Sequence, residues 1–193
     1  MKRLTSLLFI LIFTINTNLF AEQIKRISEG KEDAKITIIA YESLTCGHCA
    51  DFHKDVYPEL KKDFIDKGLV KIEFRHFPLD IAAFNASKIG QCNNDGKSDV
   101  IHILFSGQEK WGKGKTPEEA TLYLKKFIKN EGVDVDFDKC LNDKDIEDYV
   151  LKDRIEGVKK FKVNATPTII INDKKFDKTL NYKNLKKYLE KLI

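Results

Sequence analysis

The sequence of 193 residues has only four cysteines, and beyond its N-terminus it has no repeat, low-complexity block or second long hydrophobic run. It also lacks a clear excess of one charge, with 34 basic and 30 acidic residues that are interleaved, as in residues 183–191. Nucleic-acid binding would need basic residues clustered on one face, so we expect no nucleic-acid partner. The length fits one domain, or one domain with an inserted subdomain.

The N-terminus resembles an export signal. Lys2 and Arg3 precede an apolar stretch over residues 7–15, and Ala21 ends a plausible cleavage site. An uncleaved membrane anchor is the alternative, but the apolar run is too short to span a bilayer comfortably. No cysteine follows the run, which argues against a lipoprotein. We therefore expect residues 1–21 to be a signal peptide and residues 22–193 to form an exported, periplasmic domain, with 32 basic and 30 acidic residues.

The segment Cys46-Gly47-His48-Cys49 carries the clearest chemical signal. It follows residues 35–41, which read as a buried strand, and precedes a helical pattern that starts near Cys49. A cysteine at such a junction lies over unpaired backbone N–H groups and the positive end of a helix dipole, which favour a thiolate. The two-residue spacing lets Cys49 close a reversible disulfide with Cys46. This pattern predicts a thiol–disulfide exchange site with a reactive Cys46.

A lone C-x-x-C also occurs as half of a zinc site. A structural zinc needs further ligands, and neither Cys92 nor Cys140 belongs to a C-x-x-C or C-x-H pair. Cys46, Cys49 and His53 would supply only three ligands. We favour redox exchange and expect no metal or other cofactor; a non-enzymatic zinc-binding surface protein remains the alternative from another functional class.

The two other cysteines are predicted to pair with each other. In an oxidising compartment an even number of cysteines favours disulfides, and Cys92 and Cys140 remain when Cys46 pairs with Cys49. Their bridge would close a loop of about 50 residues, stabilising the fold by about 4 kcal/mol in the chain-entropy model. Two buried free thiols are the alternative.

The first half of the chain reads as a βαβ unit. Residues 24–28 suggest a short edge strand, and residues 35–41 a central strand. Apolar residues recur every four positions over 49–66, as in an amphipathic helix that Pro58 should kink or split. Residues 69–77 alternate apolar and polar, which predicts a second central strand.

The second half starts with helices and returns to strands. We expect a helical insertion over about 80–162, with segments near 80–93, 97–108, 116–130, 135–141 and 143–160. Strands are expected at 167–171 and 174–177. A final helix over 182–192 should turn four side chains toward the core: Leu185, Tyr188, Leu189 and Leu192.

Thr166-Pro167 precedes an apolar β run. Proline is allowed at the first residue of a strand, and the bond before it is a candidate for cis geometry. A cis bond would free the carbonyl and amide groups around Thr166 to pair with an extended peptide. An ordinary trans proline is an equally good interpretation of the sequence.

Together these features resemble the DsbA-like oxidoreductases of the thioredoxin superfamily. The resemblance includes the C-x-x-C after a strand, the Thr-Pro before a strand, the terminal helix, the helical insertion and two local strings, residues 41–46 and 105–111. It spans nearly the whole chain after the signal. It implies an α/β thioredoxin fold with an inserted α-helical subdomain.

The resemblance also assigns roles to residues. It implies that Cys46 is the exposed nucleophile, Cys49 the buried resolving thiol and His48 the residue that stabilises the thiolate. Thr166 and Pro167 would form the loop that faces the disulfide and binds substrate. A Cys92–Cys140 bridge is similar to a second disulfide found in some branches of the family.

One position departs from the family pattern. Many relatives carry a buried acid six residues before the first cysteine, where this chain has Ala40. Glu42 lies on the same face of the strand by alternation and is a candidate replacement.

The resemblance implies a dithiol oxidase that introduces disulfide bonds into unfolded or reduced secreted proteins. Such an enzyme is reoxidised by a membrane quinone-linked protein. A disulfide isomerase or reductase of the same fold is the nearest alternative. Isomerases of this kind usually oligomerise through an added N-terminal segment. Only about a dozen residues lie between Glu22 and the first core strand, so we expect a monomer.

Overall fold

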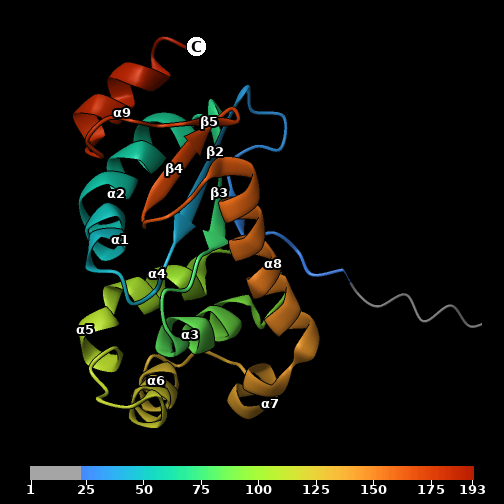
Figure 1. Ribbon diagram of the computed structural model, residues 1–193. Coiled ribbons are helices and arrows are strands. Elements are labelled where there is room, and N and C mark those ends of the chain that lie inside the picture. The colour runs from blue at the N-terminus through green and yellow to red at the C-terminus, as the bar shows by residue number, and fades with distance from the viewer. Residues whose placement is uncertain (1–22) are drawn as a thin grey trace, which may run out of the picture.

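The computed structural model describes residues 23–193, and the expected signal peptide lies outside them. One lobe is built on a five-stranded sheet and the other is helical (Figure 1). In the sheet, strands follow the order β1-β3-β2-β4-β5. Their bounds are β1 Ser28–Glu29, β2 Ile36–Glu42, β3 Val70–His76, β4 Thr168–Ile171 and β5 Lys174–Lys175.

The central strands are those expected from the sequence. β2 runs parallel to β3 and antiparallel to β4, with Ala40 paired to Phe74 on one side and to Ile169 on the other. β2 is buried on both faces because its residues are almost all apolar or β-branched, whereas β3 alternates between buried and half-buried residues. β1 has two residues, fewer than expected, and borders β3.

The helix expected over residues 49–66 is one continuous rod of alternating α and π turns. Its parts are α1 Gly47–Asp51, η1 Phe52–Val56, α2 Tyr57–Leu60 and η2 Lys61–Ile65. Because Pro58 has no N–H, it cannot donate to residue 54, and the wide turn η1 lies just before it. The rod begins two residues earlier than predicted and ends before Gly68, which has a φ of +71°.

The helical insertion extends from α3 to α8. Its helices are α3 Ile81–Gln91, α4 Asp99–Ser106, α5 Gln108–Trp111, α6 Pro117–Asn130, α7 Phe137–Asn142 and α8 Lys144–Phe161. Side-chain oxygens of Asp80, Thr116, Asp136 and Asp143 cap four of them. The short α5 was not predicted. It follows Gly107, where a Cβ would lie 2.0 Å from Phe127 Cζ, so close packing against α6 requires glycine.

Helices cover both faces of the sheet. The rod and α9 (Tyr182–Leu189) cover the face that contains Ile38 and Ala40, and α8 leaves the helical lobe to cover the face of Ile39 and Tyr41 (Figure 1). This three-layer arrangement confirms the expected thioredoxin-like fold with its insertion.

The terminal helix is shorter than predicted. Leu185 and Leu189 are fully buried and Tyr188 packs against the core, as expected. The expectation for Leu192 is wrong. The helix ends at Leu189, so Leu192 is carried away from the apolar face and is 41% exposed.

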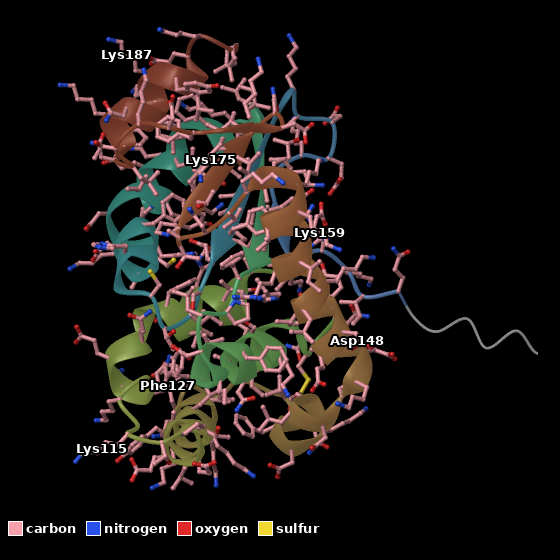
Figure 2. The ribbon with its side chains drawn as sticks, in the orientation of Figure 1. Lys115, Phe127, Asp148, Lys159, Lys175 and Lys187 are labelled. Atoms are coloured by element: carbon pink, nitrogen blue, oxygen red, sulfur yellow. A yellow bond between two sulfur atoms is a disulfide. The ribbon has the colours of Figure 1, made fainter. Side chains whose placement is uncertain are left out.

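The surface carries dispersed basic side chains. Lys115 and Lys187, for example, lie at opposite ends of the molecule (Figure 2). Within residues 23–193, no helix combines the length and apolar character required to cross a bilayer.

A disulfide joins Cys92, at the end of α3, to Cys140 in α7 (yellow bond in Figure 2). The two Cα atoms are 5.6 Å apart, and the residues are separated by 48 positions in the sequence. The bridge therefore ties two helices of the insertion together across a long loop.

Replacing both Cys92 and Cys140 by alanine is expected to lower the free energy of unfolding by about 4 kcal/mol, because the unfolded chain regains the entropy of the open loop. Urea unfolding of this variant and of the unmodified protein, both with Cys46 and Cys49 oxidised, checks the value. An unchanged free energy would contradict a structural role for the bridge.

Candidate active site

Cys46 lies at the N-terminal end of the helical rod. Its backbone is extended, with φ −81° and ψ 119°, and it acts as the N-cap of α1. Its carbonyl oxygen accepts the first helical hydrogen bonds, from the amides of Cys49 (3.1 Å) and Ala50 (3.2 Å). The Cys46 side chain is partly exposed, whereas that of Cys49, one turn into the rod, is fully buried. The two sulfurs thus differ sharply in their access to solvent.

The surroundings of Cys46 favour its ionised form. The largest cause that lowers the pKa of Cys46 is a hydrogen bond from the Cys49 thiol. Burial raises this pKa, whereas hydrogen bonds with Thr166 and with the backbone amides of Cys49 and His48 lower it further. The balance lowers the pKa of Cys46 from 9.0 to about 5. At neutral pH the sulfur of Cys46 is therefore a thiolate, the reactive form of cysteine.

Cys49 is shifted in the opposite direction. Burial is the main cause, and the hydrogen bond that its thiol gives to Cys46 and the charge of Glu42 also raise the pKa of Cys49. Cys49 therefore stays protonated at neutral pH. Glu42 ends β2 two residues after Ala40, and both side chains are buried.

The two residues between the cysteines do not act on Cys46 through a side chain. His48 reaches Cys46 with its amide, while its imidazole is 87% exposed and lies 3.4 Å from Asp51. Gly47 is the first residue of α1, and a Cβ there would meet no atom within 4 Å. The surface beside the sulfur is therefore open to a large partner.

Thr166 and Pro167 lie directly opposite the cysteines. The peptide bond between them is cis, and the carbonyl oxygen of Thr166 is 3.3 Å from Cys46 Sγ. When protonated, the Cys46 thiol donates to this oxygen. Segments 120 residues apart in the sequence thus meet at one sulfur.

The helical insertion holds the active-site loop through two residues, Gln108 and Asp80, to which the sequence assigned no role at the site. Gln108 in α5 donates to the carbonyl oxygens of Leu44 (2.8 Å) and Cys46 (3.1 Å). Thr45 donates to Asp80, which caps α3. Gln108 lies in the string 105–111 that carries part of the family resemblance, but its partners depend on the tertiary fold.

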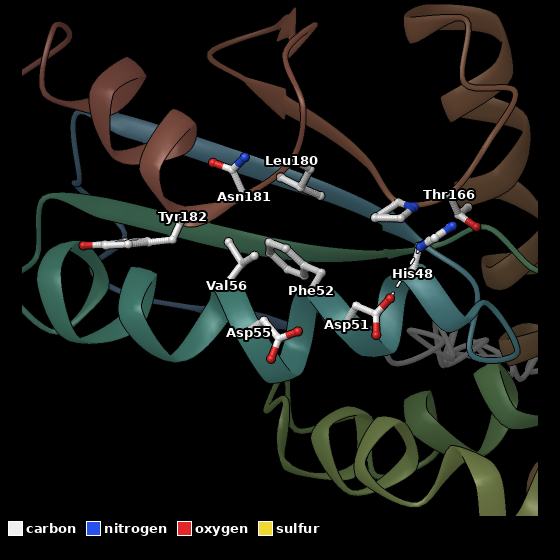
Figure 3. A pocket seen from close by; sticks show the side chains of 10 residues that line it. His48, Asp51, Phe52, Asp55, Val56, Thr166, Leu180, Asn181 and Tyr182 are labelled. Atoms are coloured by element: carbon white, nitrogen blue, oxygen red, sulfur yellow. Dashed lines mark ion pairs between the residues drawn. The ribbon is translucent and has the colours of Figure 1, made fainter.

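A pocket of about 440 Å³ extends from the cysteine end of the rod (Figure 3). The rod forms one wall, with His48 and Phe52, and the other wall includes Thr166, Leu180 and Tyr182. Its walls are mixed, with apolar side chains between polar ones. A pocket of this volume is within the range of ligand-binding sites.

The comparison with known proteins agrees with this geometry. A family model described as thioredoxin matches residues 22–191. Disulfide bond formation protein D of Bacillus subtilis is 30% identical over 172 residues, covering 84% of this chain and 74% of that protein. The chain belongs to the DsbA-like, thioredoxin-fold disulfide oxidoreductases.

Another relative is longer. A putative protein-disulfide oxidoreductase of Rickettsia bellii is 29% identical over 74% of this chain, but the chain spans only 55% of that protein. Among solved structures, α-DsbA1 of Wolbachia pipientis is 29% identical with a TM-score of 0.77, covering 86% of this chain and 90% of that one. Oxidised BdbD of Bacillus subtilis is 26% identical with a TM-score of 0.68, covering 86% and 92%. This oxidoreductase therefore shares both its sheet and its insertion with its relatives.

Thiolate absorbance of the reduced protein should appear through a single transition near pH 5, because Cys46 ionises there while Cys49 stays protonated. Titration at 240 nm checks this, with Cys46→Ala as the blank. In Cys49→Ala the midpoint should move upward, because the largest stabilising contact is lost. A midpoint above pH 8 in the unmodified protein would contradict the assignment.

Proposed function

We propose that this thiol:disulfide oxidoreductase is an exported dithiol oxidase, which introduces disulfide bonds into other proteins through Cys46-Gly47-His48-Cys49. The observation that carries the proposal is the low pKa of Cys46 beside the raised pKa of Cys49. A stabilised thiolate favours the reduced enzyme, so the oxidised enzyme is a strong electron acceptor.

The exchange proceeds in two steps. A substrate thiolate attacks Cys46 Sγ of the oxidised enzyme, the Cys46–Cys49 bond breaks, and Cys49 leaves as a thiolate that takes up a proton. A second substrate thiolate then attacks the substrate sulfur of the mixed disulfide and releases Cys46 as a thiolate. The substrate gains one disulfide and the enzyme gains two electrons, so no bound cofactor is required.

Thr166 and Pro167 are proposed to bind the substrate chain. The Thr166 carbonyl lies beside the reacting sulfur, and the pocket that starts there extends between the rod and the segment before α9. A polypeptide in extended conformation fits this path, which suits unfolded or reduced secreted proteins as substrates. We further propose export by residues 1–21, a monomer, and reoxidation by a membrane quinone-linked protein.

Two alternatives are weaker. An isomerase or reductase of the same fold would work with a less acidic nucleophile, because its dithiol has to give electrons to a substrate disulfide readily. A zinc-binding protein would need a fuller ligand set. Among residues 23–193, no three His, Cys, Asp or Glu side chains are placed to hold a metal ion.

The equilibrium between Cys46–Cys49 and a glutathione buffer tests the proposal. A strong oxidase should remain reduced until oxidised glutathione greatly exceeds the reduced form, as followed by alkylation and mass spectrometry. Cys46→Ala is the control without exchange. A pair that becomes oxidised in a strongly reducing buffer would favour the reductase alternative, and stoichiometric zinc in the purified protein would favour the metal-binding one.

The reduced protein should also melt at a higher temperature than the oxidised protein at pH 7. Cys46 ionises near pH 9.0 when unperturbed and near pH 5 in the folded, reduced protein, so ionisation stabilises this form. That stability is fully present above pH 9 and is lost as the pH falls through 5. Thermal unfolding of both forms from pH 4 to 9 checks the trend. Equal melting temperatures throughout would contradict a strong oxidase.

A further inference from the structure

A line of four ionisable side chains connects the buried cysteine to the surface. Glu42 accepts from His53 Nε2, whose distances to the two carboxylate oxygens are 3.1 and 3.0 Å. His53 Nδ1 lies 3.0 Å from Nδ1 of His102, and His102 Nε2 lies 2.8 Å from Oε1 of Glu29. Four elements supply these groups: β2, η1, α4 and β1.

The line starts in the core and borders a groove at its two histidines. Glu42 and the His53 side chain are 5% and 6% exposed, and His53 stacks on Phe105 with ring centroids 4.0 Å apart. The His102 side chain is 27% exposed. It lines a groove of about 730 Å³ between the rod and the insertion, where water reaches it.

Glu29, at the outer end, is ionised. Burial raises its pKa, but hydrogen bonds from His102, Ser98 and Tyr57 outweigh burial and lower the pKa to about 2. The ammonium group of Lys61 also faces Glu29, with Nζ 3.6 Å from Oε2 of the carboxylate. Tyr57 and Lys61 are thus the other titratable groups that face Glu29.

The contacts fix the number of protons in the line. An ionised Glu29 requires N–H at His102 Nε2, and the 3.0 Å contact between the two Nδ1 atoms requires one proton between them. The contact between His53 and Glu42 requires a third, on the imidazole or on the carboxyl. With only two protons, two nitrogen lone pairs would face each other. The four groups therefore hold three protons, and moving protons along the bonds interconverts three fully bonded arrangements, with the extra proton on Glu42, on His53 or on His102.

Burial makes the direct exchange of the Cys49 proton with solvent slow at neutral pH. Cys49 is fully buried, its sulfur accepts from the backbone amide of Ser43, the residue after Glu42, and the charge of Glu42 acts on it. From this geometry we infer that Glu42, His53, His102 and Glu29 form a proton path between Cys49 and solvent, with the two histidines as positioning residues that carry the proton. The inference rests on the proposed function, because it concerns the resolving cysteine of the same exchange.

The path acts when the enzyme is reoxidised. Cys46 forms a mixed disulfide with the oxidant. Cys49 then gives its proton to Glu42, protons shift through His53 to His102, and the proton on His102 Nε2 passes to Glu29 and from there to water. The Cys49 thiolate attacks Cys46 Sγ, and the oxidant sulfur departs as a thiolate with the electron pair. When a substrate reduces the enzyme, the same path returns a proton to Cys49.

Two substitutions break the path at different points while keeping one of its hydrogen bonds. His102→Asn places an amide near the Nδ1 position and retains the contact with His53, whereas His102→Gln retains the contact with Glu29. Neither amide releases a proton at neutral pH. Ser98→Ala is the matched control, because it removes a hydrogen bond to Glu29 but leaves all four groups of the path.

The measurement is the reoxidation of reduced protein by oxidised glutathione, quenched with acid and analysed by mass spectrometry. Both His102 variants should form the Cys46–glutathione mixed disulfide at the normal rate and resolve it about tenfold more slowly at pH 7. The defect should shrink as the pH rises, because hydroxide then removes the proton directly. Ser98→Ala should resolve normally.

Resolution at the unmodified rate in both His102 variants would overturn the path, as would a defect of the same size at every pH. The proposed function fails by a different result, namely the absence of any mixed disulfide at Cys46 in the unmodified protein. If the variants do not fold, nuclear magnetic resonance of the unmodified protein decides. Imidazole ¹⁵N and Glu42 carboxyl ¹³C shifts at pH 7 should account for three protons, and a count of two would overturn the inference.

Discussion

The hydrogen bonds that hold negative charge on Cys46 at the start of the helical rod are the interaction on which the rest depends. A thiol–disulfide exchanger needs one sulfur that ionises easily and a second that does not. Here the two sulfurs belong to one helical turn, and the fold distinguishes them by hydrogen bonds and by burial: Cys46 is partly exposed and accepts hydrogen bonds, whereas Cys49 is enclosed. The two pKa shifts also reinforce each other. The hydrogen bond that protonated Cys49 donates to ionised Cys46 lowers the pKa of Cys46 and raises the pKa of Cys49.

The insertion is part of this arrangement rather than an appendage. It grows out of the βαβ unit directly after β3 and turns back against the cysteine end of the rod (Figure 1). From there Gln108 holds the backbone at Cys46, Asp80 holds Thr45, and His102 meets His53. The bridge between Cys92 and Cys140 ties α3 to α7 within the same lobe. The stability of the helical lobe therefore supports the position of the reactive sulfur.

The sequence was sufficient for features that depend on local pattern. The alternation of apolar and polar residues predicted β3, and apolar residues at every fourth position predicted the rod. The C-x-x-C at a strand-to-helix junction identified Cys46 and Cys49. Helical segments of the insertion were found to within a few residues, since Thr116-Pro117 and similar starts are local signals.

Features that depend on contacts between distant segments could not be predicted from the sequence. The division between α4 and α5 arises because Phe127 packs against Gly107, which periodicity cannot reveal. His102 has no partner near it in the sequence, and only the approach of α4 to the rod gives it one. The contribution of His48 through its amide follows from helix geometry, not from the residue type.

The family resemblance implies a buried acid at position 40, where this chain has Ala40, and tertiary contacts show how Glu42 can carry the carboxylate instead. Moving the carboxylate two residues along β2 keeps it on the same face of the strand but brings it to the strand's end. A buried carboxylate is costly unless a donor satisfies it, and His53 provides that donor at 3.0 Å. His53 is held in turn by stacking on Phe105 and by His102, so the acid, its donor and the insertion form one unit. A carboxylate at position 40 would lie deeper, between Phe74 and Ile169, with no such neighbour in the strand pairing. The position of the acid and the presence of two histidines are therefore one structural solution, since neither satisfies its hydrogen bonds without the other.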